Sequence, residues 1–534
     1  FVEGRAVHMT EYVCAVDVGT ASARAALFDR DGTRLAKAVH PIALYQMEGA
    51  RAEHSSENIW EAVGICVRQV LAGIDPADVV AIGFDATCSL VLRDKTGAPL
   101  RLGPDGRDTI LWFDHRAAPQ AEVCNATGHP VLQVQGGAFS PEKQVPKLLW
   151  LKARRAQLWD QLGAAYDLAD FLTFRASGSN ARSNCTLTAK WSYQSERGGW
   201  QRDFLNQIGL DDFTDKADLP EHATPLGAAV GTLTADASEH LGLTTACKVS
   251  AGMVDAFSGT LGAVGHCPSD TLNDGSDLAL IAGTSSCVMS INRTPWVTRG
   301  VWGPYSDAIL PGYWTSEGGQ SATGALLDFI LRNFGPDKTE APEAHQRVEM
   351  RLRQMLDEEG PSLADGIHIL PDVNGNRSPF ADPNMRGVIS GLTMDQSFDS
   401  VCKLYWRAAV SLALGLRQII EHMRAQGPTI RVLHVTGGHV RSNLLLQLYA
   451  DVTGCDIQIA AEGEAVLLGT AALAAVTGGL FPDLIAAVRH MRTDGRVYRP
   501  NPALRDLFDQ DYAIFLRMQQ HRDELNAMRT STKV

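Results

Sequence analysis

Two stretches of small residues, each between two apolar runs, have the composition of phosphate-binding turns. The first lies between the apolar runs Val13–Val16 and Ala25–Phe28, and its small and polar residues are Asp17, Gly19 and Thr20. Such a turn lets backbone N–H groups approach a phosphate, and the Asp17 carboxylate can hold a hydrated Mg²⁺ beside it. Because the same pattern occurs in hairpins without ligands, it indicates a site only together with other features.

The same order of residue types recurs about half a chain later. Within Leu278–Asn292, an apolar run leads to Gly283, Thr284 and Ser285, and a second apolar run follows. Two such hairpins in successive halves are expected from a duplicated nucleotide-binding fold. Two unrelated hairpins are the alternative, but the repetition favours the functional interpretation.

Asp255 is the candidate general base. A short apolar segment and Gly252 lead to it, and small residues from Ala256 to Gly262 predict a helix directly after it. A carboxylate at a helix N-terminus gains roughly 0.3–1 kcal/mol from the helix dipole, so simple capping is one explanation. The functional explanation is a base that accepts the proton of an attacking hydroxyl.

Two further polar candidates lie near predicted strands of the first half. Thr87 follows the buried-type strand predicted at Val79–Phe84, where open α/β sheets bind ligands, although a tight strand crossover explains it equally well. Trp112 lies in Thr109–Arg116 beside an Asp–Arg pair, which is often purely structural.

Lys190 and Glu317 are polar residues in otherwise small-residue segments. Lys190 could reach a substrate hydroxyl or a phosphate, and an exposed lysine is the commoner alternative. Glu317 is expected before a Gly-Gly turn and a helix. Both residues are therefore candidates that need a structure to place them.

A third glycine-containing segment follows the strand predicted at Val432–Val435. Gly437 and Gly438 come directly after it, and Ser442 and Asn443 open the next predicted helix. Glycines at a strand-to-helix turn permit a flat group such as adenine to lie against the backbone.

The composition indicates a globular protein that does not bind nucleic acid or a membrane. At 534 residues, with 45% hydrophobic and 20% charged residues, the chain is long enough for two domains. Its net charge of -13 argues against nucleic acid and anionic membranes as partners. The ten cysteines form no C-x-x-C pair and suggest buried free thiols in a cytoplasmic protein. We expect Phe1–His8 to be additional residues before a native start at Met9.

Several helices are predicted around these candidates. Ser56 is expected to cap a helix that runs to Leu71. Ser140–Ala156 is expected to be a helix whose lysines lie on a solvated face. An apolar stripe predicts a core helix from Asp399 to Gln426, and the charged tail from Asp506 has a helical pattern.

Taken together, the motifs resemble those of the FGGY carbohydrate kinases. The resemblance runs from about Tyr12 to Gly479 and rests on motifs in the family's order: AVDVGT, DATCSLV, WFDHRA, PKLLWL, GMVDAFSG, IAGTSS, EGGQSA, RSPFADPNMRG and VTGGHVRSN. DATCSLV and WFDHRA look like the ribulokinase and ribitol-kinase branch of the pentulose kinases. Ala21 and Ser411 depart from the family's usual residues.

The resemblance implies an α/β fold with two actin-like (ribonuclease H-like) ATPase domains and a cleft between them. The expected domains are an N-terminal one at 9–265, a C-terminal one at 266–500 and a helical tail at 501–534. It also implies ATP and Mg²⁺ as cofactors, and it leaves a homodimer open.

The resemblance also implies roles for the candidate residues. Asp255 would be the catalytic base and Asp17 would lie on the Mg²⁺ side. The nucleotide would be held by Gly19, Thr20, Gly283, Thr284, Ser285, Gly437, Gly438 and Asn443. The sugar would contact Thr87, Trp112, Lys190, Asp255 and Glu317.

The expected reaction is ATP-dependent phosphorylation of a five-carbon sugar or polyol at a terminal hydroxyl, with D-ribulose as the first choice. Ribitol, L-ribulose and xylulose stay open, because they differ only in hydroxyl configuration or one oxidation level. An ATPase switch and a non-catalytic sugar sensor are the alternatives from other classes. The sequence has no P-loop, G-x-G-x-x-G or H-E-x-x-H motif.

Overall fold

The computed structural model describes residues 11–267, 269–336, 338–339, 341–461, 464–492 and 494–531. The expected start at Met9 lies outside the described residues. Two seven-stranded sheets dominate the fold, one in each half of the chain. The first contains β12-β13-β6-β1-β2-β3 with β14 beside β6, and the second has the order β17-β18-β16-β15-β21-β22-β23.

The two sheets share one topology. In the first, β1 pairs antiparallel with β2 and parallel with β6, and in the second β15 pairs antiparallel with β16 and parallel with β21. In the first sheet, β3 pairs antiparallel with β2 and β13 pairs parallel with β6. In the second sheet, β18 pairs antiparallel with β16 and β22 pairs parallel with β21. This repetition agrees with the duplicated fold that the two hairpins predict.

The strands of the first sheet are β1 Tyr12–Val18, β2 Ser22–Asp29, β3 Arg34–Pro41, β6 Val79–Ala86, β12 Ala229–Thr232, β13 Lys248–Ser250 and β14 Met253–Val254. Those of the second sheet are β15 Asp277–Ala282, β16 Ser286–Asn292, β17 Trp302–Ser306, β18 Trp314–Gln320, β21 Val432–Thr436, β22 Asp456–Ala460 and β23 Asp494–Tyr498. The smaller sheets contain β4 Tyr45–Met47, β5 Arg51–His54, β7 Leu90–Asp94, β8 Thr109–Ile110, β9 Leu162–Asp167, β10 Tyr193–Gln194, β11 Gly199–Trp200, β19 His368–Leu370 and β20 Val388–Ser390.

The α-helices of the first half are α1 Ser56–Val70, α2 Ala118–Asn125, α3 Gln144–Arg154, α4 Ala156–Gln161, α5 Leu168–Ser177, α6 Asn184–Lys190, α7 Arg202–Gln207, α8 Phe213–Lys216, α9 Ala235–Leu241 and α10 Asp255–Val264. Those of the second half are α11 Ser269–Asp274, α12 Gly324–Phe334, α13 Pro342–Glu359, α14 Phe398–Arg424, α15 Asn443–Thr453, α16 Ala465–Gly478, α17 Leu484–Met491 and α18 Arg505–Ser531.

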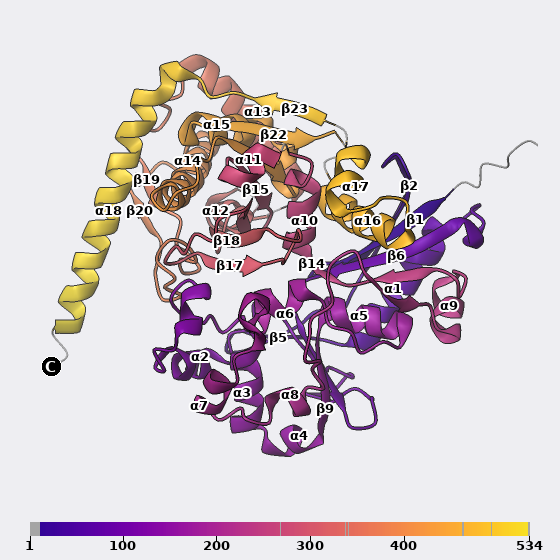
Figure 1. Ribbon diagram of the computed structural model, residues 1–534. Helices are drawn as coiled ribbons and strands as arrows, with labels where there is room; N and C mark the ends of the chain where they lie inside the picture. The colour runs from indigo at the N-terminus through magenta and orange to yellow at the C-terminus, as the bar shows by residue number, and fades with distance from the viewer. Residues whose placement is uncertain are drawn as a thin grey trace, which may run out of the picture.

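The two halves are joined by helices α10 and α16, which lie between the sheets (Figure 1). α16 is late in the sequence but packs on β1 and β6 of the first sheet, and α10 packs on β15 of the second. Glycine makes the close approach possible, because a Cβ at Gly262 would lie 2.0 Å from Ala465 O and one at Gly469 would lie 2.0 Å from Ser258 O. The junction is therefore a continuous core, and the expected domain boundary near His266 stays a prediction.

A separate group of helices packs against the third sheet, β4-β5-β8-β7-β9, at one end of the molecule (Figure 1). The expectation that the lysines around α3 lie on a solvated face is wrong for Lys143 and Lys147, which are buried. Lys143 Nζ donates to Ala189 O at 2.7 Å and Lys147 Nζ donates to Leu111 O at 2.8 Å. Carbonyl groups from distant segments compensate these ammonium groups for the loss of water.

Two local expectations are corrected by the structure. Ser55, not Ser56, caps α1, because its hydroxyl accepts from the backbone N–H of Asn58 while Ser56 is already helical. Gly318 and Gly319 form no turn but lie inside β18. A Cβ at Gly319 would lie 2.2 Å from Ser286 O, so these glycines allow close contact with β16.

Other expectations are confirmed. α14 is the predicted core helix, and the charged tail forms α18, which runs along the outer edge of the second half (Figure 1). The ten cysteines all lie in the described ranges and form no disulfide there, and all but Cys287 are buried. Within the described ranges, no helix combines the length and the apolar composition that a membrane span needs.

Candidate active site

One cavity of about 630 Å³ brings together almost all of the residues singled out in the sequence. It lies where the carboxyl ends of β1 and β14 in the first sheet face the β15–β16 turn and the end of β21 in the second. The predicted residues that line it are Asp17, Gly19, Thr20, Thr87, Trp112, Lys190, Asp255, Gly283, Thr284, Ser285, Glu317, Gly437 and Gly438. The cavity is therefore formed by both halves of the chain.

Asp17 lies near the end of β1, beside Arg24 of β2 and Asp85 of β6 in the strand register. Arg24 Nη2 is 2.5 Å from Asp17 Oδ2, and the Asp17 side chain is fully buried. Burial and the charge of Asp17 raise the pKa of Asp85 well above its usual value. Burial also raises the pKa of Asp17, but the Arg24 guanidinium opposes that rise and favours the ionised form of Asp17.

The Asp17 carboxylate fits a hydrated divalent cation. Its Oδ1 is buried and accepts no hydrogen bond from the residues that the structure describes, and Asp17 lines the cavity. A buried carboxylate oxygen without a donor is costly unless a cation or water satisfies it. Magnesium in phosphate sites is commonly bound through one or two carboxylates and several waters.

Asp255 begins α10 directly after β14, as the sequence predicts. Its Oδ1 accepts from the Ala256 backbone N–H at 2.7 Å. Burial, reinforced by the negative charge of Asp17, raises the pKa of Asp255 to about 6. A carboxylate with such a pKa, facing a cavity, is suited to accept a proton near neutral pH.

Each of the two turns that resemble phosphate sites is closed by a backbone hydrogen bond from its glycine. In the first, Gly19 N–H donates to Ser22 O at 3.0 Å, and in the second, Gly283 N–H donates to Ser285 O at 2.9 Å. The start of α12 fixes the second turn, because Gly324 N–H donates to Gly283 O at 2.9 Å. Both turns line the cavity, so an extended phosphate chain could contact both halves at once.

Gly437 and Gly438 follow β21 beside the second turn. Gly437 has φ 92°, and a Cβ there would lie 2.4 Å from Ala282 O, so only glycine fits without strain. Asn443 is the one predicted site residue that does not line this cavity. Its Oδ1 accepts from Arg496 Nη1 at 2.8 Å and from Tyr498 Oη at 2.7 Å instead.

Lys190 and Glu317 form a buried ion pair across the two halves. Lys190 Nζ is 3.3 Å from Glu317 Oε2, and the two side chains are 5% and 4% exposed. Burial lowers the pKa of Lys190, but the nearby Cys88 and then Glu317 act in the opposite direction, and the pKa lies well above its usual value. The alternative of an exposed lysine is thus excluded, and the pair offers donors and acceptors to a polyhydroxylated ligand.

Trp112 and Thr87 also line the cavity from the first half. Trp112 Nε1 donates to Thr20 Oγ1 at 3.1 Å, which links the indole to the first turn. The Thr87 and Ser89 hydroxyl groups are 3.1 Å apart. The Asp–Arg pair expected beside Trp112 consists of Asp114 and Arg116, whose Oδ2 and Nη2 atoms are 2.7 Å apart.

Sequence reasoning did not single out several residues that line the cavity. Among them are Glu142, Cys287 and Arg377. Arg377 is the first residue of the quoted motif RSPFADPNMRG, and Cys287 directly follows the motif IAGTSS, so the motifs mark their segments. Glu142 precedes α3, and nothing in its local sequence distinguishes it from an exposed glutamate.

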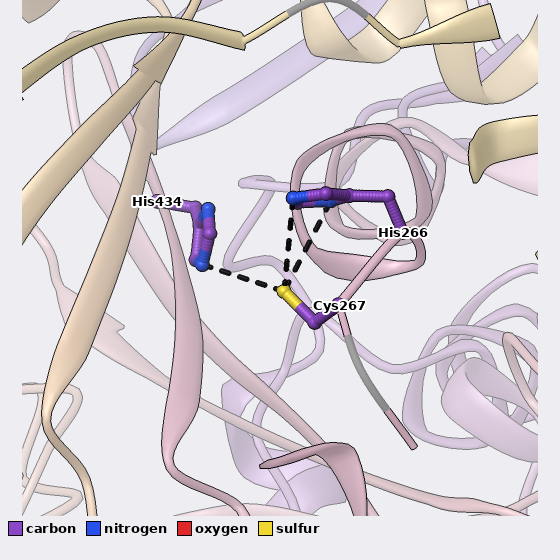
Figure 2. Close-up of side chains that lie close together, drawn as sticks. All are labelled: His266, Cys267 and His434. Atoms are coloured by element: carbon purple, nitrogen blue, oxygen red, sulfur yellow. Dashed lines mark hydrogen bonds between the residues drawn. The ribbon is translucent and has the colours of Figure 1, made fainter. Parts of the chain in front are cut away.

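A cluster of His266, Cys267 and His434 lies apart from this cavity (Figure 2). Cys267 Sγ is 3.5 Å from His434 Nε2, and the same nitrogen is 2.7 Å from Asp277 Oδ1. The Arg492 guanidinium contacts His266 and lowers its pKa together with burial. A cation would lie against this fixed positive charge, so we interpret the cluster as a buried hydrogen-bond network.

Comparison with known proteins connects this geometry to an enzyme family. The model of the "FGGY family of carbohydrate kinases, N-terminal domain" matches residues 12–262, and that of the "C-terminal domain" matches residues 278–478. An "FGGY carbohydrate kinase domain-containing protein" of Xenopus laevis is 39% identical over 97% of this chain and 98% of its own length. A D-ribulokinase of Saccharomyces cerevisiae is 37% identical over 87% of this chain and 72% of its own length. The crystal structure of a xylulose kinase from Rhodospirillum rubrum superposes with a TM-score of 0.80 at 21% identity, covering 96% of this chain and 99% of that one.

Proposed function

The chain belongs to the FGGY family of carbohydrate kinases, and we propose that it phosphorylates D-ribulose at its terminal hydroxyl to give D-ribulose 5-phosphate. The observation that carries the proposal is the cavity itself. It places one buried carboxylate of raised pKa, Asp255, beside two phosphate-type turns and the Lys190–Glu317 pair. ATP is the phosphoryl donor, as the family implies.

The choice of D-ribulose rests on the relatives together with the chemistry of the cavity. The yeast relative is named a D-ribulokinase, and it shares 37% of its residues with this chain over the aligned region. A ketopentose presents several hydroxyl groups and one carbonyl oxygen, which need both donors and acceptors. Lys190 supplies donors, while Glu317 and Thr87 supply acceptors at the same end of the cavity.

In the proposed reaction, Asp255 accepts the proton of the terminal sugar hydroxyl as its oxygen attacks the γ-phosphorus. The Thr20 and Thr284 turns hold the phosphate chain from opposite sides and keep it in line with the attacking oxygen. The segment at Gly437 and Gly438 lies against the adenosine. A Mg²⁺ held through water at Asp17 would neutralise charge on the phosphates.

The substrate assignment is tested by ADP release with Mg-ATP against D-ribulose, L-ribulose, D-xylulose, ribitol and glycerol, with a blank lacking sugar. We expect the highest kcat/KM with D-ribulose and ADP release far above the blank. A higher kcat/KM with ribitol or another pentulose would replace the substrate and keep the reaction. ADP release equal to the blank for every sugar would contradict the proposed function.

The pH dependence follows from the raised pKa of Asp255. A general base works only when deprotonated, so kcat/KM for the sugar should fall below pH about 6, close to tenfold per pH unit, and level off above it. The measurement is a pH profile of sugar-limited rates at saturating ATP. An acid limb centred near pH 4, the usual range of exposed carboxyl groups, would contradict the role of burial at this position.

A further inference from the structure

Arg377 lies at the sugar end of the cavity, on a loop between β19 and β20 of the second half. The loop is fixed on β18 by the next residue, since Ser378 N–H donates to Gly319 O at 3.2 Å. The Ser378 hydroxyl accepts from Gly319 N–H at 3.2 Å and donates to Gly300 O at 2.6 Å. Ser378 therefore contacts β18 at Gly319, two residues beyond Glu317, and Arg377 directly precedes this fixed residue.

The Arg377 guanidinium lies between groups of both halves. Its Nη2 is 3.8 Å from Glu142 Oε2, and it lies 5.4 Å from the ring centroid of Trp302 and 6.0 Å from that of Trp112. Despite burial, Arg377 and His115 lower the pKa of Glu142 to about 2, so the carboxylate is ionised. These groups orient the guanidinium plane without saturating its donors.

The hydrogen bonds of Arg377 leave donors available. In the part of the chain that the structure describes, its one hydrogen bond joins Nη1 to Cys287 Sγ at 3.4 Å, and sulfur is a weak acceptor. Cys287 Sγ in turn lies 3.7 Å from Glu317 Oε1, so the guanidinium adjoins the Lys190–Glu317 pair. A guanidinium has five N–H donors, and the remaining ones need oxygen acceptors.

We propose that Arg377 is a sugar-positioning residue, which donates hydrogen bonds from the second half of the chain to an oxygen of the bound ketopentose. The inference rests on the proposed function and adds a residue to its sugar site. Lys190 reaches the same end of the cavity from the first half. A sugar held by both residues contacts both halves, and its terminal hydroxyl is then fixed relative to Asp255.

The test compares steady-state kinetics of the full-length wild-type enzyme with Arg377→Gln, Arg377→Lys and Arg386→Gln, using D-ribulose and ATP. Arg386 is the matched control because it lies on the same loop, is exposed and donates to Asn384 O and Met385 O rather than into the cavity. Loss of a hydrogen bond from a charged donor should raise the KM for D-ribulose about 10- to 100-fold in Arg377→Gln. The KM for ATP should change little, and Arg386→Gln should resemble the wild type.

Arg377→Lys separates direct contact from a structural role, because lysine keeps the charge beside Glu142 and loses the planar fork. An intermediate KM for D-ribulose, with an unchanged melting temperature and unchanged ATP KM, would support the proposal. An unaltered KM for D-ribulose in Arg377→Gln, or equal increases in both KM values, would overturn it. If the wild type itself shows no sugar-dependent ADP release, the proposed function is contradicted, and the role of Arg377 with it. That outcome differs from a wild type that is active and an Arg377→Gln variant with an unaltered KM, which contradicts the role of Arg377 alone.

Discussion

Asp255→Asn is expected to lower kcat for sugar phosphorylation by about 10²–10⁴-fold, the usual contribution of a general base. Asparagine keeps the shape of the side chain and its contact with the start of α10, but it cannot accept the proton of the attacking hydroxyl. The loss should appear in kcat and in kcat/KM together, because the interaction develops in the transition state. The measurement is ADP release coupled to sugar, with ATP affinity determined separately by calorimetry.

Another buried carboxyl group, that of Asp167, provides the control for Asp255→Asn. Burial raises the pKa of Asp167 to about 8, and Gln144 Nε2 donates to its Oδ2 at 3.0 Å. Asp167 does not line the cavity and is protonated at neutral pH, so Asp167→Asn should leave kcat little changed. Loss of ATP binding in Asp255→Asn, or equal activity losses in the two variants, would contradict a specific role as base.

Local sequence patterns were sufficient to predict the parts of the site that single hairpins form. The first turn and the second turn each lie between two apolar runs that pair with one another, so residue spacing alone places Thr20 and Thr284 at strand ends. Asp255 is similarly fixed by a short strand and a helix of small residues. The repeated sheet topology is built on the same hairpins, because each hairpin supplies the first two strands of its sheet along the chain.

Residues whose environment comes from distant segments could not be predicted in this way. Lys147 was expected in solvent, but its Nζ donates a hydrogen bond to a carbonyl of the segment before Trp112, and no local pattern encodes that partner. Asn443 stays a predicted nucleotide contact, but the groups that orient its side chain are Arg496 and Tyr498, about fifty residues later, which its local sequence does not reveal. Glu142 and Arg377 lie 235 positions apart in the sequence, and the fold brings their side chains together.

Asp17→Asn is expected to lower kcat/KM for ATP by about 100-fold or more and to raise the Mg²⁺ concentration needed for half-maximal rate. Asn keeps the shape at the end of β1 but removes the negative charge that attracts the cation. Arg24, which is 2.5 Å from Asp17 in the wild type, then adds an uncompensated positive charge at the same place. The measurement is a Mg²⁺ titration of the initial rate at saturating sugar and fixed ATP.

Asp85→Asn is the matched control, because Asp85 lies directly beside Asp17 in the register of β1 and β6, but burial and the charge of Asp17 raise its pKa well above the usual value and favour its protonated form. Asparagine is neutral like a protonated carboxyl group and can keep the contact with the Thr470 hydroxyl. The Mg²⁺ dependence of Asp85→Asn should therefore stay close to that of the wild type, while that of Asp17→Asn shifts. A wild-type Mg²⁺ response in Asp17→Asn would exclude Asp17 from the cation site, and equal shifts in both variants would mean that the two carboxyl groups share the charge.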